Sequence, residues 1–135
     1  MAQSALPKSC TILIVENEAI IRMELDDQLV EMGYQVLAAS DAEEAIELLD
    51  AHPEIALLIT DIAMPGSMDG IRLAQHVRGR WPPVRIIVTS GLGESLVSAL
   101  PLNSIFLAKP YGLDALQTAL CGVNLARHRP AIMSA

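Results

Sequence analysis

The sequence predicts a doubly wound α/β fold in which parallel strands alternate with helices, and three observations support this prediction. Short apolar runs typical of buried strands alternate with segments whose apolar residues recur at helical spacing. Hydrophobic residues make up 52% of the chain and aromatic residues only 3%, which suits a core of aliphatic side chains around a parallel sheet. Finally, four of the apolar runs end on polar residues.

The first predicted strand–helix–strand unit occupies residues 11–39. Residues 11–15 form an uninterrupted apolar run, which is typical of a buried strand. The helix that follows is expected to end at Gly33, because glycine readily adopts the backbone conformation that terminates a helix. Residues 34–39 then predict the second strand. The buried face of the helix is expected to contain Ile21, Leu25, Leu29 and Met32.

The next helix is expected to begin at Ser40, with a capping box formed by Ser40 and Glu43. Its buried residues are expected to be Ala45, Leu48 and Leu49, and Pro53 is expected to close it. Residues 55–60 predict the third strand. A loop leads to a third helix that uses Leu73, Val77 and Trp81 and ends at the pair Pro82 and Pro83, because proline cannot continue a helix. Residues 84–89 predict the fourth strand.

The last part of the chain contains a weak helix, a strand and a final helix. Residues 93–100 are a poor helix candidate, because Gly91, Gly93 and Pro101 restrict it to about two turns of ~3.6 residues. Residues 104–108 predict the fifth strand. The last helix is marked by Leu113, Leu116, Leu120 and Val123.

Five strands and five helices with right-handed crossovers favour a flavodoxin-like five-stranded parallel sheet with strand order 2-1-3-4-5. We expect one domain over residues 10–127, preceded by an N-terminal extension, residues 1–9. Residues 128–135 show no periodicity and are expected to form a short tail, with no output domain after it.

Composition and charge exclude several classes of function. The chain has 9 Lys and Arg against 16 Asp and Glu, a formal net charge of -7, so direct binding of nucleic acid is not expected. Residues 1–9 resemble neither a secretory signal nor a membrane span, which favours a cytoplasmic protein without membrane contact. Cys10 and Cys121 match no metal-binding spacing and are expected to be reduced packing residues.

The expected strand order places strands one and three side by side, so Glu16, Asn17 and Asp61 should converge at their carboxyl ends. Clustered carboxylates repel one another unless a cation joins them, and oxygen ligands on a solvated rim suit Mg²⁺. A competing interpretation is that Glu16 and Glu18 simply begin the first helix, where carboxylates favour the positive end of the helix dipole.

Two further polar residues reach the same edge. Lys109 directly follows the apolar run of the fifth strand, where a surface lysine would be unusual, and its ammonium could neutralise an acidic pocket and hold a phosphoryl group. Thr89 ends the fourth strand. It is either a strand-favoured β-branched residue or a hydroxyl donor to a phosphoryl oxygen.

Several separated segments of the chain match one known pattern. These segments are Ile12 to Glu18, Thr60 to Pro65, Met68 to Gly70, Val88 to Gly91, and Lys109 to Tyr111. With these segments the chain resembles the receiver domains of bacterial two-component response regulators, and the resemblance covers residues ~10 to ~125. Asn17, the pair Gly66 and Ser67, and the run 89–91 also resemble a subgroup of stand-alone receivers.

This resemblance implies a role for each residue at the edge. Asp61 would be the phosphoacceptor, Thr89 and Lys109 would hold the phosphoryl group, and Phe106 falls at the aromatic switch position. The Lys109–Pro110 peptide bond would be cis. The implied ligands of Mg²⁺ are Glu16, Asn17, Asp61 and the backbone carbonyl of Ala63.

The same resemblance implies a mechanism and partners. A phosphohistidine on a sensor histidine kinase or a histidine phosphotransfer protein would present its phosphoryl group to Asp61. The new charge would draw Thr89 inward and move Phe106, which would change the surface made by residues 93–100, the fifth strand and the last helix. An unknown protein target would recognise that surface. The protein would be a monomer or a weak dimer and would catalyse its own phosphorylation and slow dephosphorylation.

Three departures from the family pattern qualify these expectations. Asn17 replaces the usual second acid, so weaker Mg²⁺ binding is expected than with aspartate there. The loop 64–70 is one residue longer than usual. Ala63 and Gly91 offer no polar side chain to orient a hydrolytic water, which predicts slow self-dephosphorylation, over minutes or longer.

Several alternative functions remain open. The protein could act as a phosphate sink that competes for a kinase, or as a receiver-like module that binds partners without phosphorylation, which Asn17 favours. A phosphatase of the haloacid dehalogenase type needs a second acid where the chain has Ala63. An FMN carrier of the flavodoxin type needs a phosphate-cradling loop where the chain has Glu16, Asn17 and Glu18.

Overall fold

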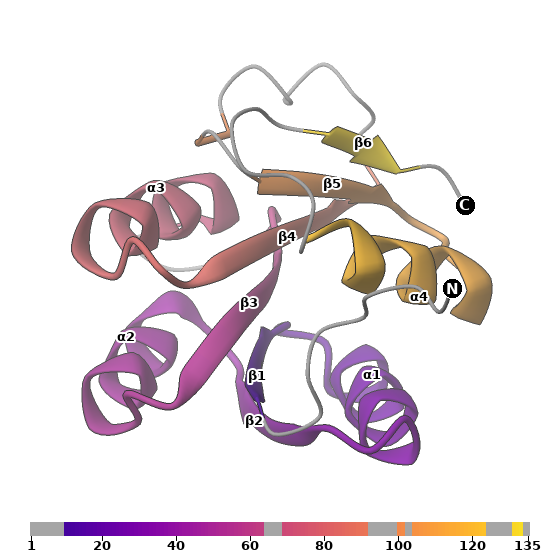
Figure 1. Ribbon diagram of the computed structural model, residues 1–135, viewed down its shortest axis with the longest axis horizontal. Coiled ribbons are helices and arrows are strands. Elements are labelled where there is room, and N and C mark those ends of the chain that lie inside the picture. The colour runs from indigo at the N-terminus through magenta and orange to yellow at the C-terminus, as the bar shows by residue number, and fades with distance from the viewer. Residues whose placement is uncertain (1–9, 64–68, 92–99, 102–103, 124–130, 134–135) are drawn as a thin grey trace.

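The computed structural model describes residues 10–63, 69–91, 100–101, 104–123 and 131–133, with the backbone alone for the last three (Figure 1). The strands are β1 (Thr11–Val15), β2 (Gln35–Ala39), β3 (Ile55–Asp61), β4 (Arg85–Ser90), β5 (Ser104–Ala108) and β6 (Ala131–Met133). The helices are α1 (Ala19–Glu31), α2 (Ala42–Ala51), α3 (Gly70–Arg80) and α4 (Leu113–Gly122). Among these described helices, none combines the length and apolar character needed to cross a lipid bilayer.

All of the strands pair in parallel, in the order β2-β1-β3-β4-β5-β6. Figure 1 shows α2 and α3 on one side of the sheet and α1 and α4 on the other. The predicted doubly wound fold with order 2-1-3-4-5 is therefore confirmed. The described residues contain four of the five expected helices, because most of the predicted helix 93–100 lies outside them. Most of the loop 64–70 also lies outside the described residues.

The sheet has one strand more than the sequence predicted. β6 pairs in parallel with β5, although residues 128–135 were expected to form a tail without periodic structure. Three residues are too few to show the alternation by which a strand is recognised in a sequence. Because α4 connects β5 to β6, these elements form a further strand–helix–strand unit, and the short strand continues the pattern of the domain.

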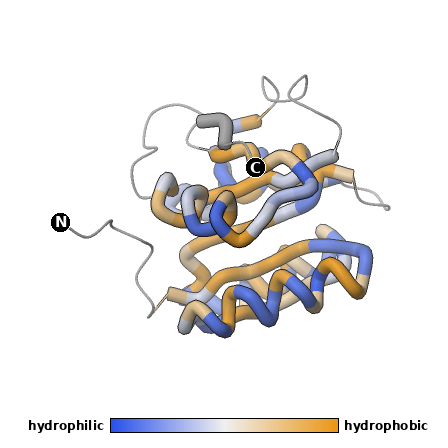
Figure 2. The backbone as a smooth tube through the Cα atoms, turned by 90° about the vertical axis from the view of Figure 1, so that its right-hand side faces the viewer, coloured by the Kyte–Doolittle hydropathy of each residue, from blue (hydrophilic) through white to orange (hydrophobic). Residues whose placement is uncertain are grey.

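The sheet divides the buried residues into two hydrophobic clusters, one on each face. The cluster on the α2 and α3 side contains Leu13, Leu58, Leu73, Val88 and Phe106. The cluster on the α1 and α4 side contains Ile12, Ile59, Leu29, Leu107 and Leu116. Figure 2 shows the corresponding hydrophobic colour along the central strands and hydrophilic stretches along the helices. Burial of both faces explains the continuous apolar runs of the strands.

Local signals fix the ends of the helices. Gly33 has a φ of 99° and ends α1, as predicted, with its N–H donating to the Val30 carbonyl (2.9 Å) and the Tyr34 N–H donating to the Leu29 carbonyl (3.1 Å). This pair of hydrogen bonds is a Schellman motif, which needs a left-handed residue.

The capping box predicted at Ser40 and Glu43 was wrong by one residue. The N-cap of α2 is Asp41, whose carboxylate accepts from the Glu44 N–H (2.9 Å), and the Glu44 carboxylate accepts from the Ser40 N–H (2.9 Å). Ser40 and Asp41 are both good capping residues, so the sequence alone did not distinguish the two registers.

Candidate functional site

The carboxyl ends of the central strands bring the expected residues together. Glu16 directly follows β1, and Asp61 is the last residue of β3. Asp61 is the register partner of Thr89 on β4. Lys109 directly follows β5, and its backbone N–H donates to the Ser90 carbonyl (2.8 Å). The parallel register of the sheet therefore positions these side chains.

Lys109 joins two buried carboxylates. Its Nζ lies 3.0 Å from Glu16 Oε1 and 3.3 Å from Asp61 Oδ2. The side chains of Glu16 and Asp61 are only 4% and 6% exposed, and that of Lys109 is 21% exposed. The other Glu16 oxygen, Oε2, accepts from the Glu18 N–H (3.1 Å), which fixes its orientation at the start of α1. Glu16 thus belongs to the acidic pocket as well as to the beginning of the helix.

The ammonium of Lys109 and the carboxyl groups around it affect one another's pKa values unequally. Burial raises the pKa of the Asp61 carboxyl; Lys109 opposes this rise and Glu16 adds to it. Burial alone would lower the pKa of Lys109, but the hydrogen bonds and charges of Glu16 and Asp61 outweigh it, and the pKa rises. The ammonium is shared between two acids, so it stays charged while each carboxylate receives only part of its stabilisation.

Gly70 supports the position of Asp61 from the start of α3. The Gly70 N–H donates to the Ile62 carbonyl (2.9 Å), and a Cβ atom at position 70 would lie 2.7 Å from both the Asp61 carbonyl carbon and Ile62 Cα. Only glycine permits this approach. The packing role of Gly70 was not predicted from the motif that contains it, although an isolated glycine at a helix start is a signal of close backbone contact.

The remaining expected residues lie on the same strands or just after them. Asn17 is exposed and follows Glu16 directly, and Ala63 is exposed, with its N–H 3.4 Å from Asp61 Oδ1. Phe106 is fully buried in the cluster on the α2 and α3 side and is the register partner of Val88. The Lys109–Pro110 bond is cis, as expected.

The donor set fits Mg²⁺ but is sparse. Two carboxyl groups share one ammonium, so the site offers acidic oxygens to a cation, and Ala63, two residues after the end of β3, adds a backbone carbonyl. Within the part of the chain that the structure describes, no three His, Cys, Asp or Glu side chains form a metal-binding group. Mg²⁺ commonly keeps several waters and needs few protein ligands, so a small number of oxygen donors is compatible with this ion.

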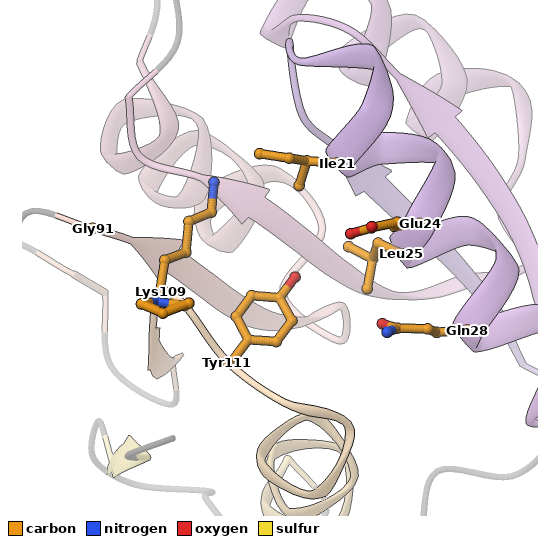
Figure 3. Close-up of a pocket in the computed structure, with 8 residues that line it drawn as sticks. Ile21, Glu24, Leu25, Gln28, Gly91, Lys109 and Tyr111 are labelled. Atoms are coloured by element: carbon orange, nitrogen blue, oxygen red, sulfur yellow. The ribbon is translucent and has the colours of Figure 1, made fainter.

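A pocket of about 460 Å³ lies beside Lys109. Figure 3 shows the Tyr111 ring extending toward α1, which contributes Ile21, Glu24, Leu25 and Gln28 from the opposite side. Burial raises the pKa of Tyr111, while Lys109 opposes the rise, so its hydroxyl stays neutral and can donate a hydrogen bond. This pocket was not predicted from the sequence, because its two walls are far apart in the chain.

A family model described as the response regulator receiver domain matches residues 12–121. The chain belongs to this family. The receiver domain resembles a response regulator receiver protein from Sinorhizobium medicae, with a TM-score of 0.80, 31% sequence identity, and coverage of 90% of this chain and 98% of that one. It is also similar to TrrA from Thermotoga maritima, solved in complex with Mg²⁺ and BeF, with a TM-score of 0.73, 26% identity, and coverage of 84% and 98%.

Curated relatives carry this domain within longer chains. Transcriptional regulatory protein PdtaR of Mycobacterium tuberculosis is 33% identical over 123 residues, which are 88% of this chain and 58% of that protein. Sensor kinase CckA of Brucella abortus is 34% identical over 119 residues, 85% of this chain and 12% of that protein. The chain therefore spans less than two thirds of the length of these relatives.

Proposed function

We propose that this receiver domain is a phosphorylation-dependent signalling switch with Asp61 as the phosphoacceptor. The observation that carries the proposal is the contact between a buried carboxylate at the end of β3 and the ammonium of Lys109, 3.3 Å away, in a chain of the receiver family. Mg²⁺, held by Glu16, Asn17, Asp61 and the Ala63 carbonyl, would supply positive charge to neutralise the oxygens of the transferred group.

The proposed reaction transfers a phosphoryl group from a histidine of a sensor kinase or phosphotransfer protein. A carboxylate oxygen of Asp61 forms a bond to phosphorus as the bond between phosphorus and the histidine nitrogen breaks, and the nitrogen keeps the electron pair. Lys109 compensates the charge on the phosphoryl oxygens, and the Thr89 hydroxyl donates a hydrogen bond to one of them. Such a loose transition state depends mainly on positioning and on charge compensation.

The signal would pass through protein contacts. We propose that Thr89 moves toward the phosphoryl group and that buried Phe106 repacks, which alters the surface near β5 and α4 for an unidentified target. We further propose a cytoplasmic location and a monomer or weak dimer. A phosphate sink would use the same chemistry without a target. A module that binds without phosphorylation is favoured by Asn17, which stands where a second acid is usual.

The deciding experiment is incubation with Mg²⁺ and acetyl phosphate, followed by peptide mass spectrometry. The expected result is one added phosphoryl group on the peptide that contains Asp61, and none in Asp61→Asn. An unmodified Asp61 at saturating Mg²⁺ would exclude both the switch and the phosphate sink, and would leave the phosphorylation-independent module. A target captured only by the phosphorylated protein would distinguish the switch from the sink.

A further inference from the structure

The short strand β6 covers the outer edge of β5. Its register pairs Ala131 with Ile105, Ile132 with Phe106, and Met133 with Leu107. An uncovered edge strand presents a row of unpaired N–H and C=O groups that invites pairing with another extended segment. β6 therefore occupies a surface that β5 would otherwise offer to a partner.

The covered strand carries the residues that would respond to phosphorylation. Phe106 lies in the centre of β5, and Lys109 follows the strand directly. Lys109 is held at two points, by its N–H to the Ser90 carbonyl (2.8 Å) and by its ammonium to Glu16 (3.0 Å) and Asp61 (3.3 Å). A change in the partner of that ammonium, or in the packing of Phe106, thus acts on the strand to which β6 is paired.

The pairing is short enough to respond to such a change. It comprises three register pairs, whereas the β3–β4 and β4–β5 pairings have five each. Only a few hydrogen bonds at this edge resist a small displacement of β5. The same displacement on the other side of β5 is resisted by the longer ladder to β4.

We propose that the outer edge of β5 is a protein-interaction surface that β6 covers in the unphosphorylated protein and that phosphorylation of Asp61 uncovers. The resident occupant is the chain's own segment 131–133. The partner that fits the uncovered edge is an extended peptide segment that adds a parallel strand. This inference depends on the proposed function, because it needs Asp61 to receive the phosphoryl group.

The test measures hydrogen exchange in the whole protein with Mg²⁺, with and without beryllofluoride as a phosphoryl mimic. When beryllofluoride binds, the amide exchange rates of Ala131–Met133 and of Ile105–Leu107 should rise about 5-fold or more, the range expected for coupled sites. Unchanged exchange with the mimic bound overturns the inference and leaves the proposed function intact. Failure to bind the mimic, monitored by fluorine NMR with Asp61→Asn as control, overturns the proposed function as well.

Substitutions of Ile132 in β6 provide an independent test of the proposal. Ile132→Pro should break the pairing, whereas Ile132→Val retains a strand-forming residue and serves as the matched control. Because coupling is reciprocal, Ile132→Pro should bind beryllofluoride about 5-fold more tightly than wild type and Ile132→Val. A peptide with the sequence of residues 129–135, added to Ile132→Pro, should restore protection of Ile105–Leu107. Equal affinities of all three proteins, or no protection by the peptide, overturn the inference.

Discussion

Gly70 lies directly against the backbone of Asp61. The hydrogen bond from the Gly70 N–H to the Ile62 carbonyl (2.9 Å) fixes the start of α3 against the end of β3. A Cβ atom at position 70 would lie 2.7 Å from the Asp61 carbonyl carbon, and the other groups it would meet are also backbone atoms that cannot rotate away. The position of Asp61, the proposed phosphoacceptor, therefore depends on the absence of a side chain at position 70.

Gly70→Ala should displace Asp61 and destabilise the fold. We expect a loss of about 1–3 kcal/mol in the free energy of unfolding, typical of overpacking, and slower phosphorylation by acetyl phosphate. The matched control is Gly79→Ala in the same helix, where a Cβ meets nothing within 4 Å. It should be stabilising by about 0.5–1 kcal/mol. Denaturant unfolding and mass spectrometry measure both effects; equal stability of the two variants would contradict the packing argument.

Lys109→Met should leave Glu16 and Asp61 buried without their shared ammonium. We expect phosphorylation of Asp61 to fall about 100-fold or more, because a group that compensates transition-state charge is lost. Stability should fall by about 1–3 kcal/mol at pH 7.

The control for Lys109→Met breaks the exposed ion pair between Arg80 and Asp50 (2.8 Å) by Asp50→Asn. That change should alter stability by less than about 1 kcal/mol. Urea unfolding and acetyl phosphate labelling provide the readouts. A Lys109→Met protein that labels as fast as wild type would show that the ammonium has no role in transfer.

Asn17→Asp should strengthen Mg²⁺ binding. A second carboxylate on the exposed side of the pocket adds a charge in a solvated environment, so we expect a gain of about 10-fold in affinity, or ~1.4 kcal/mol. Isothermal titration calorimetry measures it, with Asn17→Ala as the control that removes the amide oxygen. Identical Mg²⁺ affinities for wild type and Asn17→Asp would exclude Asn17 as a ligand.

The phosphorylated protein should persist for minutes or longer, because Ala63 and Gly91 cannot orient a water. Both residues are exposed, and a Cβ at position 91 meets nothing within 4 Å, so Gly91→Asn fits without strain. This variant should hydrolyse the phosphoryl group about 10-fold faster or more. Gly79→Asn, remote from the site, should not. Decay within seconds in wild type would contradict the expectation.

The exposed face of α1 should dock the phosphodonor. Ile20 is 76% exposed near the start of α1, at the end where Glu16 and Lys109 meet. Ile20→Asp should slow phosphorylation by a phosphorylated histidine phosphotransfer protein that labels wild type, without changing labelling by acetyl phosphate. Val30→Asp is the control, because Val30 is 54% exposed at the far end of the same helix. Equal rates for Ile20→Asp and wild type with the protein donor would exclude docking there.

The site could be predicted from sequence because its residues lie at the carboxyl ends of strands or directly after them. Parallel strands align their carboxyl ends, so the positions of Glu16, Asp61, Thr89 and Lys109 followed once the strand order was known. Contacts between distant segments could not be predicted in the same way. The pocket between α1 and Tyr111 depends on how two elements pack, and the packing of Gly70 on Asp61 depends on how α3 approaches the sheet.

Local sequence patterns gave wrong or missing predictions where two residues could play the same role or where the pattern was very short. Ser40 and Asp41 can both cap a helix, and only the structure shows that Asp41 does so. Leu113 was expected to mark the buried face of the last helix, but it is 47% exposed at the start of α4, where no following turn constrains its side chain to the core. β6 was missed because three residues carry no periodic pattern.

The proposed reacting groups lie at the carboxyl ends of the strands, whereas the exposed apolar residues Ile20, Met23 and Val30 lie on the surface of α1. This separation has a use in building synthetic circuits. If Asp61 accepts a phosphoryl group as proposed, exchange of the helix surfaces would change the specificity for kinase and target without altering the residues at the strand ends. The domain would then be suited to the construction of insulated signalling pairs that share the same phosphorylation site.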